Sequence, residues 1–383
     1  MAVTKVDISL MDNTGTTANK LLVYDGSGNL PAVDASQLTN VSTGITESSS
    51  DPTISTNPAG GVGTEWCNTT SGEVYICTDA TAGANVWKNV GAGTDNVAPV
   101  SWYGGRGVWS GGHTGSSDVN TMDYVTIATP GNATDFGDSI DTRRGRCGTS
   151  DGSRGVYAGG AASNVMDYIT ISTLGNGTDF GDLSVARGYV GACSNGSYAV
   201  WGAGTPTAGG QTNVMDYVTI STTGNAVDFG DITVARYALS GCSNGTRGVF
   251  GGGYAGGDKN EIDYITIATP GNATDFGNLT SARRYISSCD DGTKGVWGGG
   301  YPGGVTNIID YITISTTGNA TDFGDLTVAR NNGAGCSNGP RGLFGAGTTS
   351  VTIDYITIAT PGNATDFGDL TQARDYLGAC SGE

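Results

Sequence analysis

One sequence pattern recurs six times between about residue 104 and the end of this 383-residue chain. The dipeptide Asp-Tyr begins at positions spaced 44 to 49 residues apart: Asp123, Asp167, Asp216, Asp263, Asp310 and Asp354. A repeat of this length predicts small structural units that cannot bury a core alone and stabilise one another by packing side by side.

Each unit divides into four short segments with β-strand character, seen most clearly between Arg236 and Arg283. The segments are YALSGCS, RGVFGGG, IDYITIAT and TDFGNLTSAR; an Asn-Gly hairpin signal follows the first, and PGNA separates the last two. No stretch shows a helical period. The sequence therefore predicts an all-β fold, a six-bladed β-propeller of four-stranded blades over residues 97–383, preceded by small β-rich modules.

The carboxy-terminal text predicts how the repeat array closes. After the last repeated arginine, Asp375–Gly382 reads DYLGACSG, a first-strand segment with no unit of its own to follow. The first unit starts at GGRGVWSGG and is preceded only by the weak segment PVSWY. We expect the carboxy-terminal strand to pair into the first sheet, which would remove two open sheet edges.

This closure also assigns the cysteines. Cys380 would fill in the first sheet the place that Cys193, Cys242, Cys289 and Cys336 hold elsewhere, whereas Thr149 holds it in the second. Equivalent positions on separate strands rarely suit a disulfide, so we expect these side chains to pack as small apolar groups rather than bind metal or act in redox chemistry.

The repeated arginines admit two interpretations. They could bind acidic ligands, but their regularity favours ion pairs or hydrogen bonds with the repeated aspartates. The residues concerned are Arg187, Arg236, Arg283, Arg330 and Arg374.

The repeat resembles the kelch family. Kelch units carry a glycine pair after the second strand, a tyrosine in the third, an aromatic residue in the fourth and a closing basic residue. Gly252-Gly253, Asp263-Tyr264, Phe276 and Arg283 match these places. The sequence departs from the family in having phenylalanine where kelch units usually have tryptophan: Phe136, Phe180, Phe229, Phe276, Phe323 and Phe367.

The first 96 residues lack the repeat and divide into an attachment or trimerisation segment, 1–48, and a small β module, 49–96. In the second, TEWCNTT, EVYICTD and NVWKNV are strand candidates, and the Ser/Thr-rich text STGITESSSDP links the two segments. Neither segment is large enough to bury a full core alone.

Two stretches of this region resemble amino-terminal parts of fibre and appendage proteins of tailed bacteriophages, especially marine ones. They are GNLPAVDASQLTNV and GTEWCNTTSGEVYICTDATAGANVWKNVG. That resemblance implies a homotrimer formed through residues 1–96 and attachment to other virion proteins of the head or tail.

The net charge and the hydropathy of the chain exclude two classes of partner, nucleic acids and the membrane interior. Acidic residues number 36 and basic residues 18, a net charge of −18, so we expect no nucleic-acid partner. No apolar run is long enough to insert into a membrane, and the first residues do not read as a secretory signal. We therefore expect synthesis in a host cytoplasm and a final location in the virion.

Few residues suit catalysis. His113 is the only histidine, and no nucleophile motif surrounds it. The Asp-Phe-Gly-Asp text recurs in five of the six units, whereas a catalytic carboxylate pair needs one special site, so we read these aspartates as structural rather than catalytic or calcium-binding. We expect no enzymatic activity, no cofactor and no metal.

The informative positions are those where the repeat varies. Because strand direction alternates, the near-constant SNG and PGNA turns and both ends of the array lie on one face, the constant face. The loops between second and third strands lie on the opposite face, the variable face. The junctions after each arginine share that variable face. Variable loops on a rigid scaffold commonly carry binding. The candidate ligand-binding residues are His113, Gln211, Tyr254, Asp258, Lys259 and Tyr301.

These features predict a virion fibre or appendage that uses the propeller for adhesion to a host-surface glycan. Two alternatives remain. A capsid or tail decoration protein would use the variable loops to contact neighbouring virion proteins. A polysaccharide depolymerase would need a clustered carboxylate pair on the variable face.

Overall fold

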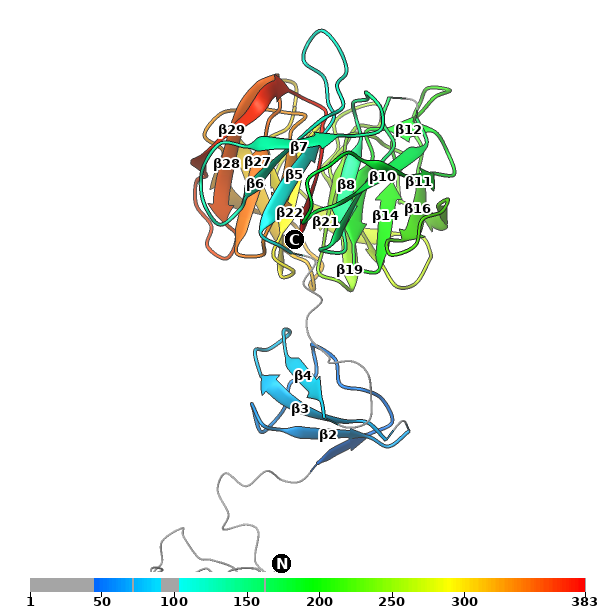
Figure 1. The fold of residues 1–383 in the computed structure, drawn as a ribbon, viewed down its shortest axis with the longest axis vertical. Coiled ribbons are helices and arrows are strands. Elements are labelled where there is room, and N and C mark those ends of the chain that lie inside the picture. Colours follow the sequence, from blue (N-terminus) through cyan, green and yellow to red (C-terminus); the bar gives the residue numbers. More distant parts are fainter. Residues whose placement is uncertain (1–44, 71, 91–102, 162, 383) are drawn as a thin grey trace, which may run out of the picture. The chain divides into compact units, whose positions relative to one another are not determined.

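The computed structural model describes residues 45–70, 72–90, 103–161 and 163–382, and within them every regular element is a β-strand (Figure 1). The chain divides into two compact units, Met1–Pro99 and Val100–Glu383. The second unit is called the repeat domain below. No helix in the described part of the chain has the length and apolar character needed to cross a membrane.

The first unit contains one small sheet, in the order β1 (Thr46–Ser48), β2 (Glu65–Asn68), β3 (Val74–Asp79) and β4 (Val86–Asn89). The three strands expected between residues 64 and 90 are confirmed. Strand β1 was missed: it pairs in parallel with β2 and lies in the stretch read as a linker, so the small sheet begins ahead of the boundary placed at residue 49. The predicted attachment segment 1–48 falls almost wholly outside the described residues.

The core of this small sheet is correspondingly small. Tyr75, Cys77 and Trp87 are its buried apolar residues. Trp66 packs its ring edge-to-face against Trp87, with ring centroids 5.9 Å apart.

The repeat domain consists of six four-stranded antiparallel sheets, each made of the four segments read from the sequence. The first strands are β8 (Cys147–Ser150), β13 (Gly191–Ser194), β18 (Ser240–Ser243), β22 (Ser287–Asp290), β26 (Ala334–Ser337) and β30 (Gly378–Gly382). The second strands are β5 (Arg106–Ser110), β9 (Arg154–Ala158), β14 (Tyr198–Gly202), β19 (Arg247–Gly251), β23 (Lys294–Gly298) and β27 (Arg341–Gly345).

The remaining strands form the outer half of each sheet. The third strands are β6 (Thr121–Thr126), β10 (Val165–Thr170), β16 (Val214–Thr219), β20 (Glu261–Thr266), β24 (Ile308–Thr313) and β28 (Ser350–Thr357). The fourth strands are β7 (Thr134–Asp138), β11 (Thr178–Asp182), β17 (Val227–Asp231), β21 (Thr274–Asn278), β25 (Thr321–Asp325) and β29 (Thr365–Arg374). A separate short pair joins β12 (Arg187–Gly188) to β15 (Thr205–Pro206).

The fourth strands are shorter than expected, except for β29. The text TDFGNLTSAR forms a strand only as far as Asn278, because the chain then leaves the sheet and directs Thr280 and Arg283 toward Asp310 of the next one.

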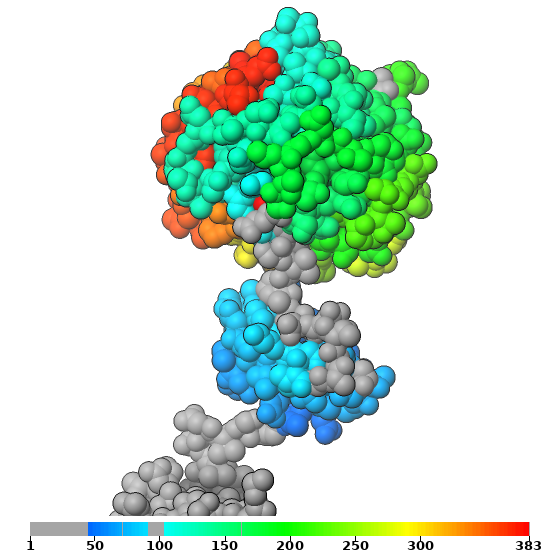
Figure 2. Space-filling model, in the orientation of Figure 1, coloured from blue at the N-terminus to red at the C-terminus, as the bar shows by residue number. Residues whose placement is uncertain are grey.

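The carboxy-terminal strand completes the first sheet, as predicted. Strand β30 pairs antiparallel with β5, and Cys380 lies opposite Val108. Each first strand also contacts the first strand of the next sheet, in the cyclic order β8, β13, β18, β22, β26, β30 and back to β8. Figure 2 shows the red carboxy-terminal residues directly beside cyan residues of the first sheet.

The cysteines pack between neighbouring sheets, which confirms their predicted role. All five at the equivalent position are buried and unpaired, and each sulfur faces a glycine on the second strand of the next sheet. A Cβ at Gly248, for example, would lie closer than 3.0 Å to Cys193 Sγ. In the unit where Thr149 replaces cysteine, the residue at the facing repeat position is Ala199 instead of glycine. The two positions therefore vary together.

The PGNA turns bind the outer strands to one another. The asparagine of each turn accepts a hydrogen bond from the main chain that ends the fourth strand of the neighbouring sheet, as Asn272 Oδ1 does from Asp231 at 3.0 Å. The glycine in each Asp-Phe-Gly text meets the same turn: Gly230 has a φ of +133°, and a Cβ there would clash with the carbonyl of Gly271. This motif is therefore a docking point between sheets.

Buried ion pairs connect the repeated arginines with the aspartate of each Asp-Tyr dipeptide, as the sequence predicted. Arg283 Nη1 lies 2.8 Å from Asp310 Oδ2, and Thr280 from the preceding sheet donates its hydroxyl to Oδ1 of the same carboxylate at 2.5 Å. Both charged side chains are fully buried. Such a pair adds little net stability over apolar packing but costs several kcal/mol when one partner is lost, so it fixes the relative position of two sheets.

Replacing Gly248 with alanine tests the sulfur-glycine packing. The new Cβ would overlap Cys193 Sγ, so we expect the free energy of unfolding, measured with urea, to fall by about 1–3 kcal/mol. Gly271→Ala is the matched control, because no atom lies within 4 Å of its Cβ position. Adding Cys193→Ala should restore much of the loss. Equal stability of the Gly248 and Gly271 variants would refute this packing role.

Candidate functional site

A closed ring of main-chain hydrogen bonds organises the variable face at the centre of the repeat domain. One residue from each junction donates its N–H to the carbonyl of the equivalent residue in the preceding unit, at 2.7 to 3.0 Å. The six residues are Gly145, Tyr189, Ala238, Tyr285, Asn332 and Tyr376. All six have left-handed backbone angles, with φ between 57° and 73°. This ring is called the junction ring below.

Three of the predicted ligand-binding residues meet around Arg284, which follows Arg283 at one junction. The Arg284 guanidinium carbon lies 4.6 Å from the ring centroid of Tyr254 and 5.2 Å from that of Tyr301. Its Nη1 lies 3.4 Å from Asp258 Oδ1. The side chains of Arg284 and Asp258 are 23% and 22% exposed, so solvent reaches both. This set of Tyr254, Asp258, Arg284 and Tyr301 is called the Arg284 cluster.

Lys259 and Gln211 lie outside this cluster. The Lys259 amine lies 3.4 Å from Glu261 Oε1, and its main chain bonds Gly253 and Arg283, so it belongs to the base of the same loop. Gln211 is exposed in the loop between β15 and β16. Among the described residues no hydrogen bond or ion pair joins its side chain to the Arg284 cluster.

His113 forms a second cluster of the same design. Its Nδ1 lies 2.8 Å from Asp118 Oδ1 and 3.2 Å from Arg144 Nη1. His113 and Asp118 hold the loop positions of Tyr254 and Asp258, and Arg144 holds the junction position of Arg284. The His113 main chain also pairs with Asp375, at 2.8 and 3.0 Å, and burial raises the pKa of the Asp375 carboxyl. Of the six predicted residues, three therefore lie in the Arg284 cluster and one in the His113 cluster, whereas Lys259 and Gln211 belong to neither.

The arginines and lysines of the described repeat domain fall into three groups, and two of these groups stabilise the sheets. Seven pair with buried aspartates: Arg143, Arg146, Arg187, Arg236, Arg283, Arg330 and Arg374. Five begin second strands and stack on a tyrosine of the third: Arg106, Arg154, Arg247, Lys294 and Arg341. The other three are Arg144, Lys259 and Arg284, all on the variable face.

Arg144 and Arg284 were not among the predicted site residues. The signal that marks them is the doubled arginine at two junctions, Arg143-Arg144 and Arg283-Arg284, where the other units have a single arginine.

Three tyrosines of the junction ring meet on its axis. Tyr189, Tyr285 and Tyr376 come from alternate units, and their ring centroids are 5.6 to 6.0 Å apart in edge-to-face arrangement. The residues between them are small or short. A Cβ at Gly145 would already lie 3.0 Å from the Tyr189 ring. Six large side chains would not fit at this point, so alternation is a packing requirement.

Below the tyrosines the first strands surround an axial channel that holds two cavities, which share lining residues such as Gly148 and Ala192. One, of about 100 Å³, is lined by the junction ring and small residues such as Gly148 and Ala192. The other, of about 80 Å³, lies at the constant face and is lined by the serines that end the first strands.

One aspartate interrupts that ring of serines. Asp290 stands where the other units have Ser150, Ser194, Ser243, Ser337 and Ser381. Tyr103, the first described residue of the repeat domain, donates its hydroxyl to Asp290, and Ser243 donates its main-chain N–H at 3.0 Å. Burial raises the pKa of the Asp290 carboxyl to about 6 despite these bonds. The start of the domain is thereby fixed at the mouth of the channel on the constant face.

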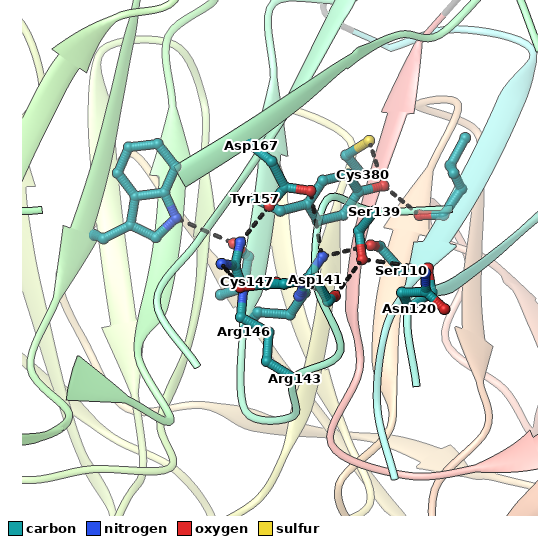
Figure 3. A network of polar contacts seen from close by, with 12 residues as sticks. Ser110, Asn120, Ser139, Asp141, Arg143, Arg146, Cys147, Tyr157, Asp167 and Cys380 are labelled. Atoms are coloured by element: carbon teal, nitrogen blue, oxygen red, sulfur yellow. Dashed lines mark hydrogen bonds and ion pairs between the residues drawn. The ribbon is translucent and has the colours of Figure 1, made fainter. Parts of the chain in front are cut away.

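A polar network replaces apolar packing between the first and second sheets (Figure 3). Arg146 stands where four other units have Val190, Leu239, Ile286 or Leu377 and the fifth has Gly333. It donates to Ser110 Oγ at 2.8 Å and contacts Asp167 and Asp141 at 3.5 and 3.2 Å. Burial lowers the pKa of Arg146 to about 10.

This network compensates for a missing hydroxyl. Ile140 occupies the position from which a serine or threonine donates to the Asp-Tyr carboxylate in the other units, and Arg146 supplies Asp167 with a second cation instead. Arg143 is the first. Within the described residues no three metal-ligating side chains of the His, Cys, Asp or Glu type gather in one place.

No protein-family model matches the chain. No curated protein matches it either.

Replacing Asp290 with serine, the residue at this position in the other five units, tests the role of the buried carboxyl at the constant face. Because the folded state raises this pKa above the unfolded value of 3.8, the aspartate favours folding at low pH and loses that advantage as the pH rises toward 6. We expect the stability of Asp290→Ser relative to the parent to increase by about 3 kcal/mol from pH 4 to pH 7. Thermal unfolding across that range measures it. Asp275→Ser, at an exposed site, is the control, and a pH-independent difference for Asp290→Ser would contradict the assignment.

Proposed function

We propose that this chain is a structural protein of a tailed-bacteriophage virion, a fibre or appendage whose repeat domain is a six-bladed kelch-like β-propeller. Its amino-terminal part joins three copies and attaches them to other virion proteins. Its variable face adheres to a glycan on the host surface. The resemblance of residues 28–41 and 63–91 to phage fibre modules supports the location.

The observation that carries the adhesive role is the division of labour among the basic residues. Eleven of them recur at scaffold positions, in buried ion pairs or on repeated tyrosines, and Arg146 is held in a buried ion-pair network, whereas Arg144, Lys259 and Arg284 break the repeat and lie on the variable face. A face that varies while its scaffold stays constant is the usual arrangement of a binding surface.

The chemistry of the Arg284 cluster suits a sugar. Tyr254 and Tyr301 supply aromatic faces that pack against the C–H groups of a sugar ring, and Arg284 and Asp258 supply a donor and an acceptor for its hydroxyls. Because the guanidinium already faces a carboxylate, the cluster has no unbalanced charge to select an anion. It favours a neutral, hydroxyl-rich ligand.

Trimer formation fits the small size of the first unit. A core of three buried apolar residues leaves the sheet of Thr46–Asn89 weakly stabilised by itself, and association would bury more of it. Three displayed domains would also convert weak single-site binding into useful avidity.

The solution mass tests the assembly. By light scattering we expect the full chain to have three times its 38.6 kDa monomer mass, and a 97–383 fragment to be monomeric. Circular dichroism would confirm that the fragment retains its β structure. A monomeric full chain would contradict the trimer and leave the repeat domain to be explained without avidity.

A glycan array probed with the labelled full chain tests the adhesive face. We expect Arg284→Ala to weaken the strongest glycan signals at least tenfold, because the residue connects both tyrosines and Asp258. Lys88→Ala in β4 removes the same charge from an exposed site of the small sheet and serves as control. If no glycan binds, or if both variants behave as the parent does, adhesion through this face is refuted. Binding to purified virions would then favour a decoration role.

A further inference from the structure

Arg144 and Arg284, the two arginines that break the repeat on the variable face, stand on opposite sides of the junction ring. Arg144 directly precedes Gly145 in the chain, and Arg284 directly precedes Tyr285. Counted along the main-chain hydrogen bonds of the ring, Gly145 and Tyr285 are three steps apart in either direction. The Arg284 cluster and the His113 cluster therefore lie on opposite sides of the axis.

The three axial tyrosines, each partly exposed, lie between the two clusters. The Arg284 guanidinium carbon lies 5.6 Å from the ring centroid of Tyr285. That centroid in turn lies 6.0 Å from the Tyr189 centroid and 5.7 Å from the Tyr376 centroid. Tyr189 and Tyr376 are the two neighbours of Gly145 in the junction ring. Aromatic rings therefore connect one cluster with the other, and Tyr189, Tyr285 and Tyr376 are called the tyrosine track below.

The far end of the track joins the His113 cluster directly. Asp375, the residue before Tyr376, exchanges two main-chain hydrogen bonds with His113, at 2.8 and 3.0 Å. Arg144 Nη1 lies 3.2 Å from His113 Nδ1 and 3.6 Å from Asp118 Oδ1. The side chains of Arg144 and Asp118 are 36% and 30% exposed. This end is therefore open to solvent and offers a guanidinium beside a carboxylate, as the Arg284 cluster does.

The scaffold does not require these side chains. At the junction position of the two arginines, the other four units have Gly188, Tyr237, Asn331 and Asp375. The ring itself needs only residues that tolerate a left-handed backbone, and Gly145 and Ala238 show that small ones suffice. Tyr189, Tyr285 and Tyr376 instead have bulky side chains at φ values of 57° to 60°. Such residues at positive φ are costly, and backbone strain of this kind is often kept where a site uses it.

The charge of the two ends favours a neutral ligand. The Arg284 guanidinium already faces Asp258, and Arg144 lies between the carboxylate of Asp118 and the nearby Asp375. An anionic ligand would lose hydration without finding a free counter-charge at either end.

The arrangement also favours a long ligand. The track offers aromatic faces and each cluster offers hydrogen-bonding groups, which suits a chain of sugar rings whose C–H faces pack on tyrosine and whose hydroxyls bond the clusters. One sugar residue can contact one cluster. A ligand that contacts both must cross the tyrosine track.

We propose that the two clusters and the tyrosine track form one extended site, which takes a neutral polysaccharide chain across the axis. The chain places a sugar residue at each cluster and others over the tyrosines. This assignment deepens the proposed adhesive function and rests on it. Once one cluster holds the chain, contact with the second is intramolecular, so a long glycan binds more tightly than its short fragments.

A glycan array probed with the labelled full chain tests the extended site. It carries neutral glycans of glucose, galactose and N-acetylglucosamine, each with one, two or at least four residues, at equal surface density. In at least one series we expect the long members to bind about tenfold more strongly than the short ones. Arg144→Ala and Arg284→Ala should each reduce the long members to the level of the short ones, because either change leaves a single cluster.

Two controls accompany these variants. Lys88→Ala in β4 removes one positive charge from the small sheet and should bind as the parent does. Glycine and asparagine already occupy the position of Arg144 in other units, as Gly188 and Asn331, so Arg144→Ala should fold, which its thermal unfolding verifies.

The outcomes separate the extended site from the adhesive function. Binding that depends on both arginines and increases with glycan length supports the extended site. Binding that depends on only one of the two arginines, or that is equal for short and long glycans, overturns the extended site and leaves adhesion through a single cluster. Binding that depends on neither arginine, or the absence of any glycan signal, removes the adhesive function and the extended site together.

Discussion

The junction ring is the constraint on which the repeat domain depends. Its six main-chain hydrogen bonds run from unit to unit and return to their start, because Gly145 donates to Tyr376 as each later residue donates to its predecessor. Every junction must therefore contribute one residue with a left-handed backbone, and the first strands must meet at matching heights. The bond between residues 145 and 376 joins the most distant junctions in the sequence. It forms only when the last unit has folded, so closure is a late and non-local event.

Around this ring, neighbouring sheets are matched by complementary substitutions within one chain. Cysteine faces glycine at five interfaces, and the exception replaces both partners, with Thr149 and Ala199. The hydroxyl that supports each buried carboxylate is missing only where Arg146 supplies a second cation. Both exceptions involve the second sheet, next to the sheet that β30 completes. The residues on the two sides of each interface are thus matched to each other, so that each sheet packs best against its correct neighbour.

Periodicity explains what the sequence could predict. The four strands of each unit, the pairing of β30 and the arginine-aspartate pairs all follow from positions that recur. Strand β1 was missed because a three-residue polar strand has no period to detect and forms only through its partner β2. Arg284 and Arg146 were missed for a different reason. Their roles depend on residues brought together by neighbouring sheets, which a single unit's text does not contain.

The axis of the ring is also the point where strict repetition fails for a physical reason. The side chains of Tyr189, Tyr285 and Tyr376, with ring centroids 5.6 to 6.0 Å apart, already meet there, so six side chains of that size would disrupt the junction ring. Equivalent positions must therefore differ here, whereas at the cysteine, arginine and asparagine positions they must agree. Because the six junction-ring positions carry different side chains, substitutions there leave the interfaces between neighbouring sheets intact. The variable face therefore differs from unit to unit at its centre, where the junction-ring side chains differ. It also differs at its edge, where the loops between second and third strands take no part in packing between sheets.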